Sequence, residues 1–173
     1  RCARNDEVLM ARLSRPLTSG EVALSRTVFG DAIRYADVRI CHHKWIFFQP
    51  RGVVMAPMGS LHFNPHGELY CDDFSAASQR LQGLFIHEMT HVWQAQTRGR
   101  WYLVLMRHPF APYSYSLKPG WLLERYGLEQ QAEIVRHYWL LTQGMVVGGG
   151  PGVEAYRAIL PFTPGLDVPA PIA

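Results

Sequence analysis

Hydrophobic positions recur at helical spacing in several stretches of this chain. The pattern predicts helices over residues 19–29, 72–97 and 128–143, and a shorter one over 153–160. Thr18 and Glu21 have the spacing of a capping box at the start of the first helix, and Gly30 follows its last apolar position. The chain is therefore expected to be built mainly from these helices.

Short apolar runs lie between the first two of these helices. Alternation and turn residues predict strands over residues 38–41, 53–58, 60–63 and 68–71. Asn64, Pro65 and Gly67 predict a turn before the last of them. Such short runs indicate a small and mainly antiparallel sheet. The segment 101–119, rich in aromatic residues and proline, carries no clear pattern.

The composition is that of a globular protein. Of 173 residues, 48% are hydrophobic and 18% charged, which suits one domain over residues 1–173, with a core at about 18–145 and a Gly/Pro-rich extension at 146–173. The net charge of +3 comes from scattered basic residues, so no nucleic-acid partner is expected. Neither a membrane span nor a signal peptide is visible. The missing initial methionine favours a piece of a longer protein.

The cysteines limit the disulfide and metal chemistry. Cys2, Cys41 and Cys71 are odd in number and form no C-x-x-C pair, which excludes a zinc site of four cysteines. A single Cys41–Cys71 bridge is one alternative. Three buried free thiols are the favoured interpretation.

The most informative motif is H-E-x-x-H at His87, Glu88 and His91, within the second predicted helix. Histidines four residues apart on a helix face the same way, so the pair can bind one metal ion. Glu88 lies between them and is expected to act as the general base on a water molecule. An uncompensated cluster of this kind would be costly in an apolar helix, which argues against a chance match.

The third ligand is expected from the next predicted helix. Glu129 and Glu133 lie four residues apart there and project from one face. One carboxylate would bind Zn²⁺, and the other would accept the spare ring N–H of a ligating histidine. Glu129 is favoured as the ligand and Glu133 for the second role, although the reverse assignment stays open.

Several other side chains are candidates for lesser roles. A donor that stabilises the oxyanion is expected among four residues, namely Tyr113, Tyr115, Tyr126 and His137. The remaining histidines are not expected to bind metal. Two are adjacent and would point to opposite sides of a strand, two flank a predicted turn, and one precedes a proline and is expected at the surface. These are His42, His43, His62, His66 and His108.

Residues 84–94 and 126–135 together resemble gluzincin-type metallopeptidase domains attached to bacterial Rhs and VgrG secretion proteins. The resemblance implies an α+β, zincin-like fold in which the H-E-x-x-H helix packs on the Glu-bearing helix. It implies one zinc ion with Glu129 as ligand. It also implies an antibacterial effector delivered by a type VI secretion system, with a cognate immunity protein.

These observations favour a zinc metallopeptidase that acts on a protein or peptide substrate. A zinc amidase directed at peptidoglycan would share the same metal site, so the sequence does not separate the two. A catalytically silent, zinc-stabilised binding module is the alternative from another class. It would fold with metal but hydrolyse nothing.

Overall fold

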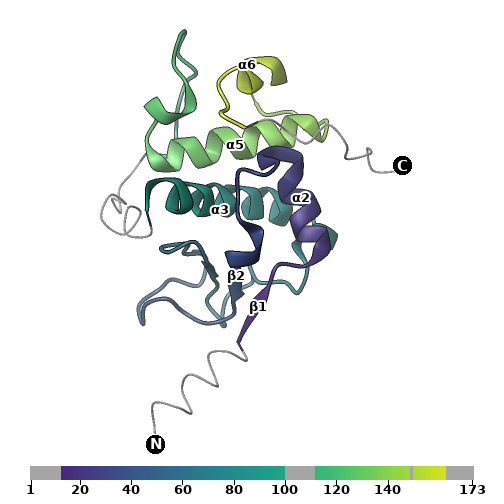
Figure 1. Cartoon of the computed structure of the whole chain (residues 1–173), viewed down its shortest axis with the longest axis vertical. Helices are drawn as coiled ribbons and strands as arrows, with labels where there is room; N and C mark the ends of the chain where they lie inside the picture. Colours follow the sequence, from purple (N-terminus) through teal and green to yellow (C-terminus); the bar gives the residue numbers. More distant parts are fainter. Residues whose placement is uncertain (1–12, 100–111, 149, 163–173) are drawn as a thin grey trace, which may run out of the picture.

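The computed structural model describes residues 13–99, 112–148 and 150–162, and it shows an α+β fold (Figure 1). Four α-helices and a three-stranded sheet make up this part of the chain. The helices are α2 (Ser19–Phe29), α3 (Gln79–Arg98), α5 (Leu128–Thr142) and α6 (Val153–Arg157). The strands are β1 (Ser14–Pro16), β2 (Arg39–Cys41) and β3 (Leu61–His62). Short 3-10 turns, η1 (Tyr35–Asp37), η2 (Phe74–Ala76) and η3 (Leu123–Arg125), connect them.

The sheet is smaller and more mixed than the sequence predicts. β2 lies in the middle, with β1 antiparallel on one side and β3 parallel on the other. The prediction over residues 53–58 was wrong except for one antiparallel bridge, Met55 to His62, and residues 68–71 form no strand. β1 was not predicted, because three residues carry too little alternation to register as a pattern.

Helices α3 and α5 lie side by side, and both contribute buried residues to the hydrophobic core (Figure 1). Both were predicted, but α3 begins at Gln79 rather than at residue 72. Asp73 does accept a hydrogen bond from a backbone N–H, that of Ser75, but it thereby caps the turn η2 instead of the helix. The segment before α3 therefore forms a separate turn that packs against α2.

The start of α2 is tied to that turn through a buried carboxylate. The capping box of Thr18 and Glu21 is confirmed. The Glu21 carboxylate also accepts hydrogen bonds from both terminal nitrogens of Arg15, at 2.8 Å each, and from the backbone N–H of Phe74 at 3.0 Å. Gly20 permits this close approach, because a Cβ there would lie 2.1 Å from Ser75 Oγ. We call these contacts the Glu21 cluster.

The described residues include two of the three cysteines and all the helices that can be tested as membrane spans. Cys41 and Cys71 are free, with Cys41 buried and Cys71 half-buried, so the Cys41–Cys71 bridge is absent. Cys2, the segment 100–111 and the tail 163–173 lie outside the described residues. Within the described residues no helix has the length and apolar character that crossing a membrane requires.

Candidate metal centre

The H-E-x-x-H motif lies in the buried middle of α3, on the side that packs against α5. His87, Glu88 and His91 are only 5%, 4% and 1% exposed. The rings of His87 and His91 have their centroids 5.0 Å apart, as one helical turn requires. The two imidazoles therefore face the same neighbour.

That neighbour is Glu129, in the first turn of α5. Its Oε2 lies 3.2 Å from Nε2 of His91 and 3.4 Å from Nε2 of His87. Ligand atoms from all three residues lie within 4.8 Å of one another, and Glu129 is 2% exposed. The structure thus brings together the three residues that the sequence proposes as ligands.

Two glutamines fix the orientation of the His91 ring, and neither was singled out for this role from the sequence. Gln131 donates its amide N–H to the backbone carbonyl of Tyr126, so its amide oxygen is free to accept from Gln94 at 2.9 Å. Gln94 donates also to the carbonyl of Leu128, which can only accept. The amide oxygen of Gln94 must therefore receive the Nδ1–H of His91, at 2.8 Å.

This chain of hydrogen bonds determines which nitrogen of His91 can bind an ion. Because Nδ1 carries the proton, Nε2 of the neutral ring presents its lone pair toward the Glu129 carboxylate. A lone pair that faces a carboxylate oxygen in a buried site is unfavourable unless a cation lies between or beside them. The geometry of His91 and Glu129 therefore suits a metal ion or an extra proton.

Glu133 lies one turn further along α5, beside the other side of the His87 ring. Its Oε1 is 2.9 Å from Nδ1 of His87, although the contact is not aligned as a hydrogen bond. Burial alone would lower the pKa of His87, but Glu129 and Glu133 raise it to about 9. Burial likewise opposes ionisation of Glu133, whereas His87 and Arg136 lower its pKa to about 2. Glu129 and Glu133 thus favour the protonated form of the His87 ring, which a bound cation would replace.

The four candidates for the oxyanion donor lie in different surroundings. Tyr113 is 53% exposed, and its ring centroid is 6.2 Å from that of His87. Tyr115 is hydrogen-bonded to His137 Nδ1 and, at 2.9 Å, to the hydroxyl of Tyr156. Tyr126 is a core residue whose hydroxyl accepts from the backbone N–H of Lys118. Tyr113 is therefore the candidate that combines exposure with a position beside a ligand.

A cleft of about 730 Å³ adjoins the cluster. Tyr113, Tyr115 and His137 line it, while none of His87, Glu88, His91 or Glu129 does. His137 connects the two regions, since its Nε2 is 3.4 Å from Glu133 Oε2. Burial lowers the pKa of His137. The cleft is therefore next to the His–Glu cluster, and the side chains of Tyr113 and His137 in its wall contact residues of that cluster.

The remaining histidines of the described residues lie in three different surroundings. His42 stacks on Tyr70 with ring centroids 3.9 Å apart, and His66 lies in the Asn64–Gly67 turn that the sequence predicts. His108 lies outside the described residues. His43 and His62 come together beside Cys41, which the sequence interpretation did not foresee.

The fold and this geometry define an α+β domain with a buried His–Glu cluster between two helices. No family model matches the chain. The type VI secretion system spike protein VgrG2b of Pseudomonas aeruginosa is 41% identical over 137 residues, which are 75% of this chain and 13% of that protein. The solved effector domain of Pseudomonas aeruginosa VgrG2b superposes with a TM-score of 0.66 at 35% identity, over 84% of this chain and 83% of that domain.

The chain therefore belongs to the family of VgrG2b effector domains. It spans only a small part of the full-length spike protein, whereas the match covers most of the solved effector domain.

Proposed function

We propose that this domain is a zinc-dependent metallopeptidase that acts as a type VI secretion effector. The observation that carries the proposal is the convergence of Nε2 of His87, Nε2 of His91 and a Glu129 carboxylate oxygen, with Glu88 on the same helix. A three-ligand set of two imidazoles and one carboxylate is typical of catalytic zinc. The proposed hydrolytic activity and the proposed zinc ion both rest on this geometry.

The residues present fit a zinc ion. Zn²⁺ is bound by histidine nitrogen and carboxylate oxygen, and it needs each donor in its deprotonated form. Gln94 secures that form for His91, because it occupies the other ring nitrogen. Glu133 lies where it can serve His87 in the same way. When bound, zinc would polarise the scissile carbonyl and lower the pKa of a water molecule to about 7.

Glu88 is the group that moves the proton in this proposal. Its carboxylate takes a proton from the attacking water and passes it to the leaving amine. Burial keeps Glu88 away from bulk solvent, since the residue is 4% exposed. Tyr113, on the cleft side of His87, is the donor that we assign to the developing oxyanion. Protein or peptide is the substrate class, and the adjoining cleft would receive part of it.

The effector role follows from the relatives. VgrG2b is a type VI spike protein, and the solved domain is described as its effector domain. We propose that the present domain is likewise carried by a VgrG protein and delivered into a target cell. A cognate immunity protein in the producing cell would be the expected partner.

Two variants test the enzyme proposal. His87→Ala should remove about one zinc per chain by plasma mass spectrometry, whereas His66→Ala, which changes an exposed histidine in a turn, should not. Glu88→Gln should keep that zinc and lower peptide hydrolysis at least about 100-fold. Full activity in Glu88→Gln would contradict the mechanism.

The substrate assay separates the alternatives. Hydrolysis of purified peptidoglycan fragments but not of unfolded proteins would replace the peptidase with an amidase at the same site. Zinc that is retained in a wild-type protein without any hydrolysis would favour a binding module. Either result would leave the family assignment unchanged.

A further inference from the structure

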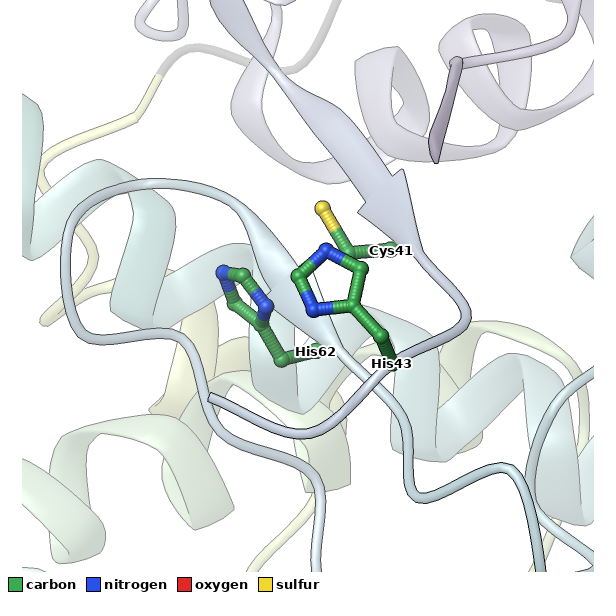
Figure 2. A group of neighbouring side chains, drawn as sticks. All are labelled: Cys41, His43 and His62. Carbon is green, nitrogen blue, oxygen red and sulfur yellow. The ribbon is translucent and has the colours of Figure 1, made fainter. Parts of the chain in front are cut away.

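A second group of potential metal ligands lies at the sheet, away from the H-E-x-x-H motif in sequence. Figure 2 shows the side chains of Cys41, His43 and His62 pointing toward one another. One ligand atom from each lies within 4.8 Å of the others. Cys41 and His62 are buried, and His43 is half-buried. A thiol and two imidazoles are the donors that bind zinc most strongly in proteins.

The parallel pairing of β2 with β3 creates this group. Cys41 and His62 are register partners in that ladder, so their side chains project from the same face of the sheet. His43 follows two residues after Cys41 and folds back, with its ring centroid 5.0 Å from that of His62. The three side chains therefore lie close together, although Cys41 and His62 are 21 positions apart in the sequence.

His62 shows that the group is not satisfied by protein contacts alone. His62 is only 7% exposed, and its buried Nδ1 has no hydrogen-bond partner among the described residues. A buried polar atom without a partner costs on the order of 1–3 kcal/mol. Burial also lowers the pKa of His62 to about 4, so the ring is neutral at neutral pH and keeps a lone pair to offer.

The ring of His43 is held in the form that a metal ligand needs. Its Nδ1 lies 3.1 Å from the backbone carbonyl of Lys44. A carbonyl only accepts, so Nδ1 carries the proton and Nε2 of the neutral ring carries the lone pair. A ring N–H donated to a backbone carbonyl is the usual support for a histidine that binds metal through its other nitrogen.

From these observations we propose that Cys41, His43 and His62 form a second metal site that binds one Zn²⁺ ion. In a tetrahedral zinc site neighbouring donors lie about 3.5 Å apart, which small side-chain rotations within the 4.8 Å limit can reach. Binding forms the sulfur–zinc bond and releases the thiol proton to solvent. Three protein donors would leave a fourth coordination position for water.

The role that the geometry gives this ion is structural. The donors come from the end of β2, the loop after it and β3, whose own ladder comprises only two residue pairs. An ion bound to all three would fasten the parallel strand pair. It would do so independently of the His87, His91 and Glu129 centre, since no ligand is shared.

Cobalt distinguishes this site from the first one. Co²⁺ replaces Zn²⁺ in sites of both kinds, but only a thiolate ligand gives a sulfur-to-cobalt charge-transfer absorption in the near ultraviolet. The full chain titrated with Co²⁺ should show this band, and added Zn²⁺ should bleach it. His87→Ala should leave the band intact, so failure of the first centre would not remove it.

Thiol variants assign the band to Cys41. Cys41→Ser should abolish it, while Cys71→Ser and Cys2→Ser, which change the other two thiols, should retain it. Absence of the band in wild-type protein, or its persistence in Cys41→Ser, would overturn the proposal. If far-ultraviolet circular dichroism shows that Cys41→Ser is unfolded, His43→Gln decides the matter. His43 is half-buried, and its replacement keeps the Cys41 thiol. The variant should bind cobalt at least about 10-fold more weakly. Unchanged binding would overturn the proposed ligand set.

Discussion

Two buried glutamates of this domain, Glu21 and Glu129, differ in what surrounds them. Glu21 is fully buried and accepts from Arg15, from its own helix cap at Thr18 and from the backbone of Phe74. Glu129 is also buried, and its Oε2 lies 3.2 Å from Nε2 of His91 and 3.4 Å from Nε2 of His87, nitrogens whose capacity to donate depends on protonation. The first carboxylate accepts from donors that are always present, whereas the second lies against imidazole nitrogens that donate only when they are protonated.

The difference separates a structural carboxylate from a functional one. A buried charge that is hydrogen-bonded by guanidinium and backbone N–H groups holds elements in place. A buried carboxylate that faces imidazole nitrogens with lone pairs is suited to bind an ion. Changes at the first should therefore lower stability and spare zinc, whereas changes around the second should lower zinc binding.

The largest effect is expected at Glu21. Glu21→Ala leaves the Arg15 guanidinium and two backbone N–H groups without their acceptor, which should lower the free energy of unfolding by on the order of 3–5 kcal/mol. Urea denaturation measures the loss. Asp31→Ala, which removes an exposed ion pair with Arg26 at the other end of α2, should cost less than about 1 kcal/mol. Equal losses in both variants would contradict the distinction.

An intermediate effect is expected at Tyr113, on kinetics alone. Tyr113→Phe removes the hydroxyl assigned to the oxyanion and should lower kcat about 100-fold, with KM and zinc content unchanged. Tyr126→Phe is the control, because its hydroxyl accepts from the Lys118 backbone within the core and should affect stability instead. An unchanged kcat in Tyr113→Phe would move the oxyanion role to another residue.

The smallest effect is expected at Gln94, on metal affinity. Gln94→Leu removes the acceptor of His91 Nδ1–H, and zinc affinity should fall about 10- to 100-fold. Competition with a chromophoric chelator measures it. Gln96→Ala, which removes a half-buried amide that contacts the Arg34 backbone two residues along α3, should leave affinity unchanged. A wild-type affinity in Gln94→Leu would show that the hydrogen bond does not orient the ring.

The sequence predicted the main helices, and the structure brings His87, His91 and Glu129 together from two of them, for a physical reason. α2, α3 and α5 each repeat apolar residues over several turns, and capping residues mark the start of α2. The spacing of His87 and His91 within one helix fixes their relative direction without any knowledge of the fold. The spacing of Glu129 and Glu133 fixes their relative direction on α5 in the same way. Only the packing of α3 against α5 had to be assumed.

The sheet and the second cluster could not be read in this way. Strands of two or three residues carry no reliable alternation, and the parallel register of Cys41 with His62 is a long-range contact. His62 paired with His66 has a plausible local spacing, yet the structure pairs His62 with Cys41 and His43. The sequence likewise did not predict that Gln94 and Gln131 orient His91, because the role of an amide depends on which groups it bonds in the folded chain.

The distance along the chain between His91 and Glu129 affects the unfolded state as well as the site. An ion held by both residues closes a loop of 38 residues. By the relation used for covalent cross-links, closing such a loop removes about 4 kcal/mol of chain entropy from the unfolded ensemble. The ion would therefore act as a reversible cross-link between α3 and α5. Chelation should loosen that helix pair, while the Glu21 cluster, which is held by hydrogen bonds and the Arg15 ion pair, stays intact.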